Sequence, residues 1–226
     1  HSLFQNLNRT ATYIGKKTLA NQLLTLSPND EISRNHQAVN ELSKKLDWRQ
    51  EFMAFAKISN DNQSNYQTLL KWSTFNSTPL SKSTVFISYF LPLLFLLVLA
   101  GYIVTYSTTF ATALSYLFLI NLIVLGRFMN RIQAEIANSS NIDKTIHQYS
   151  LLLQKIEEET FQSGKLIDLQ QKLLFKKENA SVHLKQLAGL FSKMDSIGNF
   201  VTAIVFNGTF LFNLHVLKSL IQWKIE

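Results

Sequence analysis

The sequence predicts an all-α protein, a helical bundle into which a hydrophobic helical hairpin is inserted. Two observations lead to this prediction. The 226 residues include only 7 Gly and 3 Pro, which favours helices over turn-rich β architecture. Between Lys82 and Arg127, 44 consecutive residues carry no charged side chain, a length that suits two membrane-spanning helices and a tight connection.

Apolar residues at helical spacing predict further helices on both sides of this uncharged segment. Those before it cover residues 3–26, 31–46, 48–58 and 63–75, and those after it cover 128–153, 165–178 and 181–195. Gly15 permits a break in the first of these helices. Asn29 or Asp30 is the expected N-cap of the second. We also expect the second spanning helix to run on past Arg127.

The uncharged segment divides into two predicted spans of unequal strength. Val85–Thr105 would form a helix of about 31 Å, and its 14 Leu, Ile, Val and Phe residues favour insertion by about 6 kcal/mol in total. Pro92 predicts a kink, which spanning helices tolerate. Phe110–Gly126 is the weaker span because polar residues interrupt it, and Tyr106–Thr109 is the expected turn. The interrupting residues are Thr112, Ser115 and Asn121.

Basic residues flank the segment on both sides and predict its topology. Lys82 precedes it, and Arg127 and Arg131 follow it, so the positive-inside rule predicts a membrane protein with both soluble segments cytoplasmic. The alternative is a long buried hairpin in a soluble protein, although so small a domain has little mass with which to bury 44 residues. The predicted domains are therefore residues 1–83, 84–126 and 127–226.

A second uncharged run covers residues 196–217. It contains Gly, His and three Asn residues, which would be costly inside hydrocarbon. We therefore expect a buried core helix here, with a third span as the alternative. The polar and small residues of this run are Gly198, Asn199, Asn207, Gly208, Asn213 and His215.

No catalytic, cofactor or metal site is predicted. The chain has no cysteine, and no phosphate loop, GxGxxG or GxSxG motif occurs. Gly15-Lys16-Lys17-Thr18 is only superficially similar to the end of a phosphate loop, and it lacks the earlier glycine and a preceding apolar strand. The net charge of +7 is spread along the chain. It indicates a solvated surface with positive membrane flanks, and a nucleic-acid footprint stays open.

The N-terminal segment resembles a known family. Residues 3–19 have the form L-x-x-x-L-[ND]-R-T-x-T-x-x-G-[RK]-[RK]-x-L. Residues 31–42 carry Ile32, Arg34, Ala38-Val39 and Glu41-Leu42 in the order of the family pattern I-x-x-R-x-x-A-V-x-E-L, with Arg34 one position early. Both are similar to the opening of the core, or lever, domain of the MutS mismatch-repair ATPases. The matching residues that we single out as its structural motif are Arg9, Thr10, Thr12, Gly15, Arg34 and Val39.

The resemblance implies an all-helical connector within a longer protein. Residues 1–83 and 127–226 would be the two arms of the core domain, and residues 84–126 would replace the DNA-contacting clamp by a transmembrane hairpin. The chain begins at His1 and ends at Glu226 without a helix stop signal, so we expect a fragment. Its own ATPase domain would follow and would bind ATP and Mg²⁺. A homodimer is implied, DNA binding stays open, and the family's mismatch-reading Phe-x-Glu motif does not occur.

The predicted function is thus a non-catalytic connector that transmits nucleotide state and is tethered to the membrane. The rival is a membrane scaffold with no role for nucleotide or DNA. A phosphate loop within about 150 residues after Glu226, roughly one domain length, would favour the first. A third alternative is a DNA-binding module, which a steep salt dependence of binding would reveal.

Overall fold

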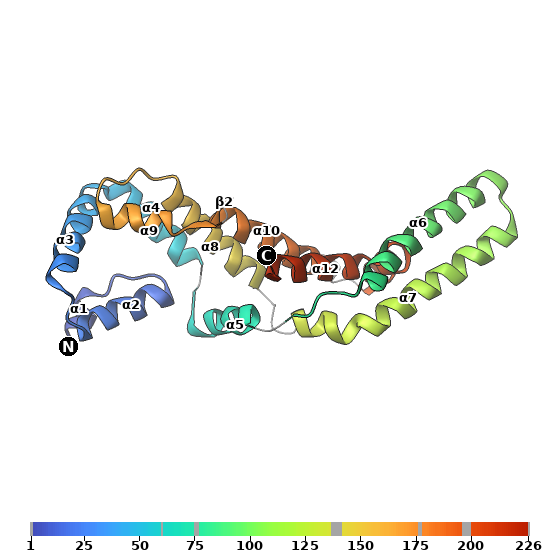
Figure 1. Cartoon of the computed structure of the whole chain (residues 1–226), viewed down its shortest axis with the longest axis horizontal. Helices are drawn as coiled ribbons and strands as arrows, with labels where there is room; N and C mark the ends of the chain where they lie inside the picture. The colour runs from blue at the N-terminus through green and yellow to red at the C-terminus, as the bar shows by residue number, and fades with distance from the viewer. Residues whose placement is uncertain are drawn as a thin grey trace. The chain divides into compact units, whose positions relative to one another are not determined.

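The computed structural model describes residues 2–59, 61–74, 77–136, 142–175, 178–195 and 200–225. It confirms the predicted fold class, because 84% of it is helical and 1% is strand, with two long apolar helices (Figure 1). His1, Gly198, Asn199 and Glu226 lie outside the described residues.

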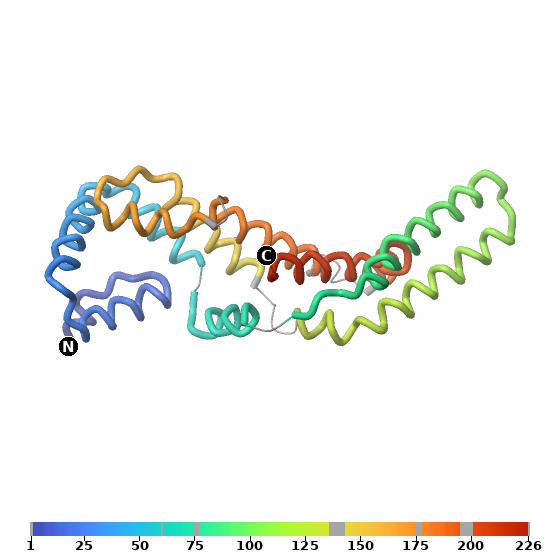
Figure 2. The backbone as a smooth tube through the Cα atoms, viewed as in Figure 1, coloured from blue at the N-terminus to red at the C-terminus, as the bar shows by residue number. Residues whose placement is uncertain are grey.

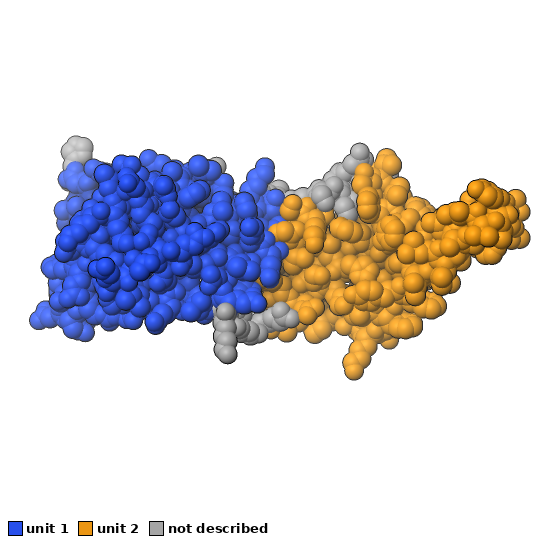
Figure 3. Space-filling model, turned by 90° about the horizontal axis from the view of Figure 1, so that it is seen from above, with its two compact units in different colours: residues 1–71, 140–188 blue, residues 72–139, 189–226 orange. Residues whose placement is uncertain are grey.

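Contacts divide the chain into two compact units, and each is built from two stretches of sequence (Figure 3). Unit 1 comprises residues 1–71 and 140–188, and unit 2 comprises residues 72–139 and 189–226. The expected domain divisions after residues 83 and 126 stay predictions.

Unit 1 contains α1 (Leu3–Leu7), α2 (Tyr13–Leu24), α3 (Asn29–Lys44), α4 (Leu46–Ile58), α8 (Ile142–Glu157) and α9 (Gly164–Gln171), with most of α5 (Gln63–Thr74) and the start of α10 (Ala180–Asp195). Helix α3 packs on α9, and α4 packs on α8. The apolar faces of these amphipathic helices supply a small core that includes Ile146 and Leu152, and Phe161 between α8 and α9 adds to it.

Three details of unit 1 differ from the sequence prediction. The first predicted helix breaks at residues 8–12 and not at Gly15, because Asn8 Oδ1 accepts hydrogen bonds from Thr10 and turns the chain. Pro28 occupies the N-cap position of α3, so Asn29 and Asp30 lie inside the helix. The helix predicted over 165–178 ends at Gln171, and an antiparallel ribbon of β1 (Leu174–Phe175) and β2 (Glu178–Asn179) follows it.

Unit 2 contains α6 (Lys82–Thr105), α7 (Thr108–Ile136), α11 (Phe200–Phe210) and α12 (Phe212–Ile225). Helices α6 and α7 run side by side as a hairpin, the green and yellow-green pair of Figure 1. Helix α7 continues past Arg127 to Ile136, as expected. Pro92 lies inside the first half of α6.

The single helix predicted over residues 196–217 is wrong. The chain forms α11 and α12 instead, bent by 78° at the break between them. Leu211 takes a left-handed backbone conformation at this break, with φ of 50°. Its N–H donates to the Asn207 carbonyl and its own carbonyl accepts from Leu214, so one residue ends α11 and begins α12. Leu214 and Leu217 of α12 are buried, as a core helix requires, but α11 exposes Val201 and Val205.

Candidate membrane hairpin and its junctions

The hairpin of α6 and α7 carries the apolar surface that the sequence predicted. Both helices are long and apolar enough to cross a membrane, with mean hydropathy of 2.3 and 1.9 over their spans. Only 11% of each span is buried within the chain. Large side chains such as Phe86, Leu97, Val104 and Ile123 are exposed. The hairpin is therefore not the buried core of this chain, contrary to the soluble alternative.

Local polar contacts form the turn between the two helices. Tyr106 adopts a left-handed conformation with φ of 48°, and its N–H donates to the Tyr102 carbonyl at 2.8 Å. The Ser107 and Thr109 hydroxyls lie 2.7 Å apart. Near the turn, a Cβ on Gly101 would come within 2.8 Å of the Phe110 ring. The small residue thus lets α6 and α7 approach closely, a packing that is also typical of membrane helix pairs.

The asparagines of the apolar helices satisfy the backbone at the break between α11 and α12. Asn121 of α7 is fully buried, and its amide donates to the Gly208 carbonyl at 2.7 Å. The Asn207 side chain accepts the Asn213 N–H at 2.8 Å. A broken helix leaves backbone groups without intrahelical partners, and these amides replace them. Asn121 could have been found from sequence only as a polar interruption of an apolar span.

Close packing holds α11 against α7 at the same point. A Cβ on Gly208 would lie 2.2 Å from the Phe118 ring, so no larger residue fits there without a shift of the helix. Helix α12 contacts α6 through His215, whose Nε2 lies 2.9 Å from the Ser88 carbonyl oxygen. The break therefore packs against both helices of the hairpin.

A buried ion pair joins the end of α12 to the end of α7. Lys224 Nζ lies 3.1 Å from Glu135 Oε2, and the two side chains are only 7% and 2% exposed. Lys224 also donates to the Ser77 hydroxyl at 3.0 Å and lies 4.3 Å from the centre of the Trp72 ring. The Trp72 indole N–H donates to the Glu135 carbonyl at 3.1 Å. We call these four residues the base junction. No sequence pattern indicated these contacts, because the four residues come from distant parts of the chain.

The predicted motif residues of the N-terminal segment have local structural roles in unit 1. The Arg9 guanidinium donates to the Asn8 carbonyl at 3.1 Å, and Thr10 donates to the Asn8 side chain. Thr12 is the N-cap of α2, and its hydroxyl accepts the Gly15 N–H at 3.1 Å. A Cβ on Gly15 would come within 2.8 Å of that hydroxyl. The structure thus brings Arg9, Thr10, Thr12 and Gly15 together around one turn.

The two remaining motif residues lie elsewhere, on α3. Arg34 pairs with Asp168 of α9 on the surface of unit 1. Val39 is 64% exposed, so it does not pack in the core of this unit. A second ion pair between the same helices joins Lys165 to Glu31 at 2.8 Å. Arg34 therefore contributes to the docking of α9 on α3, and the structure gives Val39 no packing role.

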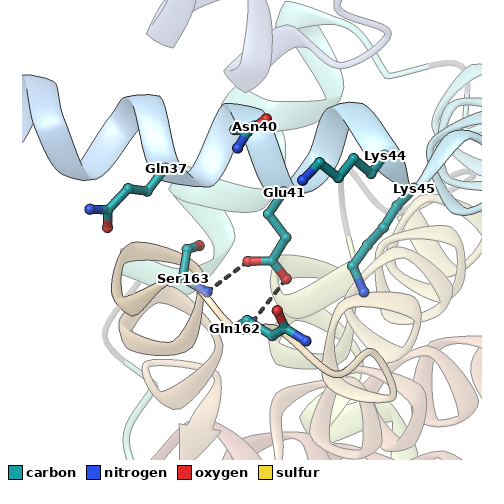
Figure 4. A pocket seen from close by; sticks show the side chains of 7 residues that line it. All are labelled: Gln37, Asn40, Glu41, Lys44, Lys45, Gln162 and Ser163. Atoms are coloured by element: carbon teal, nitrogen blue, oxygen red, sulfur yellow. Dashed lines mark hydrogen bonds between the residues drawn. The ribbon is translucent and has the colours of Figure 1, made fainter.

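Glu41 of α3 caps the N-terminus of α9 (Figure 4). Its carboxylate accepts the backbone N–H groups of Gln162 at 2.9 Å and Ser163 at 2.7 Å. Burial opposes its ionisation, but the hydrogen bonds from Ser163 and Gln162 and the charge of Lys45 together hold the Glu41 pKa below its ordinary value of 4.5. Lys45 lies beside it and pairs with Glu159 at 2.6 Å.

The surface around Glu41 is a shallow pocket of about 430 Å³. Its lining residues are polar or charged, namely Gln37, Asn40, Glu41, Lys44, Lys45, Gln162 and Ser163 (Figure 4). Glu41 already accepts the N–H groups of Gln162 and Ser163, so these two donors are not open to another anion. Its residues serve helix docking.

Nothing in the described ranges groups three or more side chains of the kind that bind metal ions. Comparison of the chain with models of protein families, with curated proteins and with solved structures gave no match. The similarity of residues 3–42 to the MutS core domain therefore stays a prediction from the sequence. The arrangement itself offers an apolar hairpin, a bent helix pair against it, and a buried ionic junction.

Proposed function

We propose that this chain is a membrane-tethered helical connector, which passes a conformational signal between a membrane hairpin and a cytoplasmic partner domain. The observation that carries the proposal is the apolar surface of α6 and α7, of whose spans only 11% is buried within the chain. Water would solvate such a surface poorly, whereas the acyl region of a bilayer matches it in polarity and thickness.

The charges at the open end of the hairpin support a cytoplasmic location for it. Lys82 lies at the start of α6, and Arg127 and Arg131 lie in the last third of α7. By the positive-inside rule, this end faces the cytoplasm and Ser107 in the turn faces the opposite side. Both soluble segments of the chain are then cytoplasmic.

The base junction supports a role in transmission. Lys224, near the last described residue, contacts Glu135 at the end of α7 and Ser77 just before α6. A displacement of the end of α12 therefore changes contacts with the segment that enters α6 and with the last turn of α7, which together form the open end of the hairpin. Rigid helices joined by a buried polar cluster are suited to move as one body.

By its resemblance to the MutS core domain, the partner would be the ATPase domain of the same protein, with ATP and Mg²⁺ as its ligands. The signal would then be nucleotide state, and the connector itself would have no catalytic residues. A homodimer is proposed on the same basis. DNA is not required by this proposal.

Cysteine accessibility tests the membrane part of the proposal directly, since the chain has no native cysteine. Single variants Ser107→Cys in the turn and Ser33→Cys in α3 are expressed and probed with a membrane-impermeant maleimide in right-side-out and inside-out vesicles. We expect Ser107→Cys to react only from outside and Ser33→Cys only from the cytoplasmic side. Release of the chain by alkaline carbonate, or reaction of both cysteines from one side, would contradict the hairpin.

A further inference from the structure

We infer that α11 and α12 form a re-entrant element, which enters the bilayer beside the open end of the hairpin and returns to the same side. The inference rests on the proposed function, because it takes the hairpin to lie in the membrane. It chooses between two arrangements that a bent apolar helix pair allows, a broken span and a re-entrant pair.

Both ends of this element lie beside one residue. The Trp72 ring is 5.2 Å from Phe191, before α11, and 6.0 Å from Trp223, near the end of α12. Trp72 also donates to the carbonyl of Glu135, near the end of α7. The path from Phe191 to Trp223 thus starts and finishes at the open end of the hairpin, whereas a spanning element would finish at the opposite end.

The break between α11 and α12 lies too close to the open end of the hairpin for the two helices to cross the bilayer. At the break, Gly208 contacts Asn121 and His215 contacts Ser88. Ser88 lies six residues beyond Lys82, and Asn121 lies six residues before Arg127, so each is about 9 Å further along its helix than the flanking cation. The hydrocarbon core is about 30 Å thick. Figure 2 shows the red segment turning back near the base of α6.

The exposed face of α11 fits lipid acyl chains. Its exposed side chains are Val201, Val205, Phe206 and Phe210, with exposed fractions between 41% and 65%. No Asp, Glu, Lys or Arg occurs from residue 196 to residue 217. Helix α11 packs on both α6 and α7, so this face adjoins the apolar surface that the proposed function places in lipid. The buried amides at the break satisfy the backbone groups that lipid could not.

Four single-cysteine variants in membrane vesicles test this inference. Ser192→Cys and Gln222→Cys mark the two ends of the element, Val205→Cys marks the exposed face of α11, and Phe90→Cys on α6 is the lipid-facing control. Each variant is probed with an impermeant maleimide from either side. Each is also labelled in detergent with an environment-sensitive fluorophore and reconstituted with lipids that carry a bromine-substituted acyl chain, which quenches fluorophores in the bilayer.

We expect Ser192→Cys and Gln222→Cys to react from the cytoplasmic side only. Val205→Cys should resist the maleimide and be quenched by the bromolipid to about the same extent as Phe90→Cys. Reaction of the two ends from opposite sides would overturn the inference in favour of a broken span. Reaction of Val205→Cys with the cytoplasmic maleimide, without quenching, would make α11 a water-exposed helix. In both cases, the hairpin is still supported if Ser107→Cys reacts only from the side opposite to the cytoplasm. If Ser107→Cys no longer reacts from that side, the proposed function itself fails.

Discussion

Gly15 is the third residue of α2, where its small size protects a helix cap. The Thr12 hydroxyl accepts its N–H, and a Cβ would approach that hydroxyl to 2.8 Å. We expect Gly15→Val to displace the cap and destabilise the protein by about 1–3 kcal/mol, the range of lost caps and strained core positions. Unfolding in detergent measures this cost.

The matched control is Lys44→Ala, a change of an exposed side chain. Its effect should stay within about 0.5 kcal/mol, as is usual for surface positions. Equal shifts of the melting temperature for Gly15→Val and Lys44→Ala would remove the structural role assigned to Gly15. The alignment of residues 3–19 to the MutS core domain would then lose its best physical support.

Lys224 and Glu135 form an ion pair in which the loss of either partner should lower the free energy of unfolding. Both side chains are almost fully buried at the base junction. Lys224→Met removes the ammonium that pairs with the buried Glu135 carboxylate, and Glu135→Gln removes the carboxylate charge that pairs with the buried Lys224 ammonium. We expect each to reduce the free energy of unfolding by about 3 kcal/mol or more.

A double-mutant cycle separates this pair from its surroundings. The variant carrying both Lys224→Met and Glu135→Gln leaves no buried charge of the pair, so its loss of stability should be clearly smaller than the sum of the two single losses. Additive losses in the same detergent would mean that the two groups do not interact. The base junction would then not couple α12 to α7.

At the scale of elements, the docking of α9 on α3 depends on pH through Glu41. Its pKa is lowered in the folded state, so its contribution to stability is present above the ordinary pKa of 4.5 and is lost as pH falls through the folded pKa. We expect the difference in unfolding free energy between wild type and Glu41→Gln to be constant above about pH 5 and to shrink below about pH 4.

The control for this prediction is Asn40→Ala, which changes an uncharged residue of the same pocket. Its difference from wild type should not vary with pH. Hydrogen exchange at the Ser163 amide adds a local readout, because this N–H donates to Glu41. An unchanged pH profile in Glu41→Gln would show that another group, and not Glu41, governs the acid sensitivity of this contact.

For the whole molecule, we expect no nucleotide hydrolysis by this chain alone. Lys16 and Lys17 lie on α2 after a turn, and the sequence has no complete phosphate loop to hold phosphates. Phosphate release from ATP by the purified chain should match the protein-free background. Turnover that Lys16→Ala or Lys17→Ala abolishes would show that this segment is a nucleotide site and that the chain is more than a connector.

The sequence by itself was sufficient for the all-α class and for the hydrophobic hairpin. Both follow from local properties, namely apolar residues at helical spacing and a charge-free length matched to a bilayer. The N-terminal pattern also drew attention to Thr12 and Gly15, whose contact spans only three residues. Local contacts of this kind are accessible to sequence reasoning because the interacting groups are held together by the helix itself.

Only the tertiary structure decided how distant polar residues are used. Asn121 and Gly208 are 87 residues apart, Glu135 and Lys224 are 89 apart, and Glu41 and Ser163 are 122 apart. In the sequence, Asn121, Glu135 and Glu41 are isolated polar residues, and the usual location of such residues is the surface. Burial makes an unpaired polar group costly, so the fold brings each one to a partner that no local pattern specifies. The break at Leu211 depends partly on such a contact, because the Gly208 carbonyl beside it accepts a hydrogen bond from Asn121 of α7.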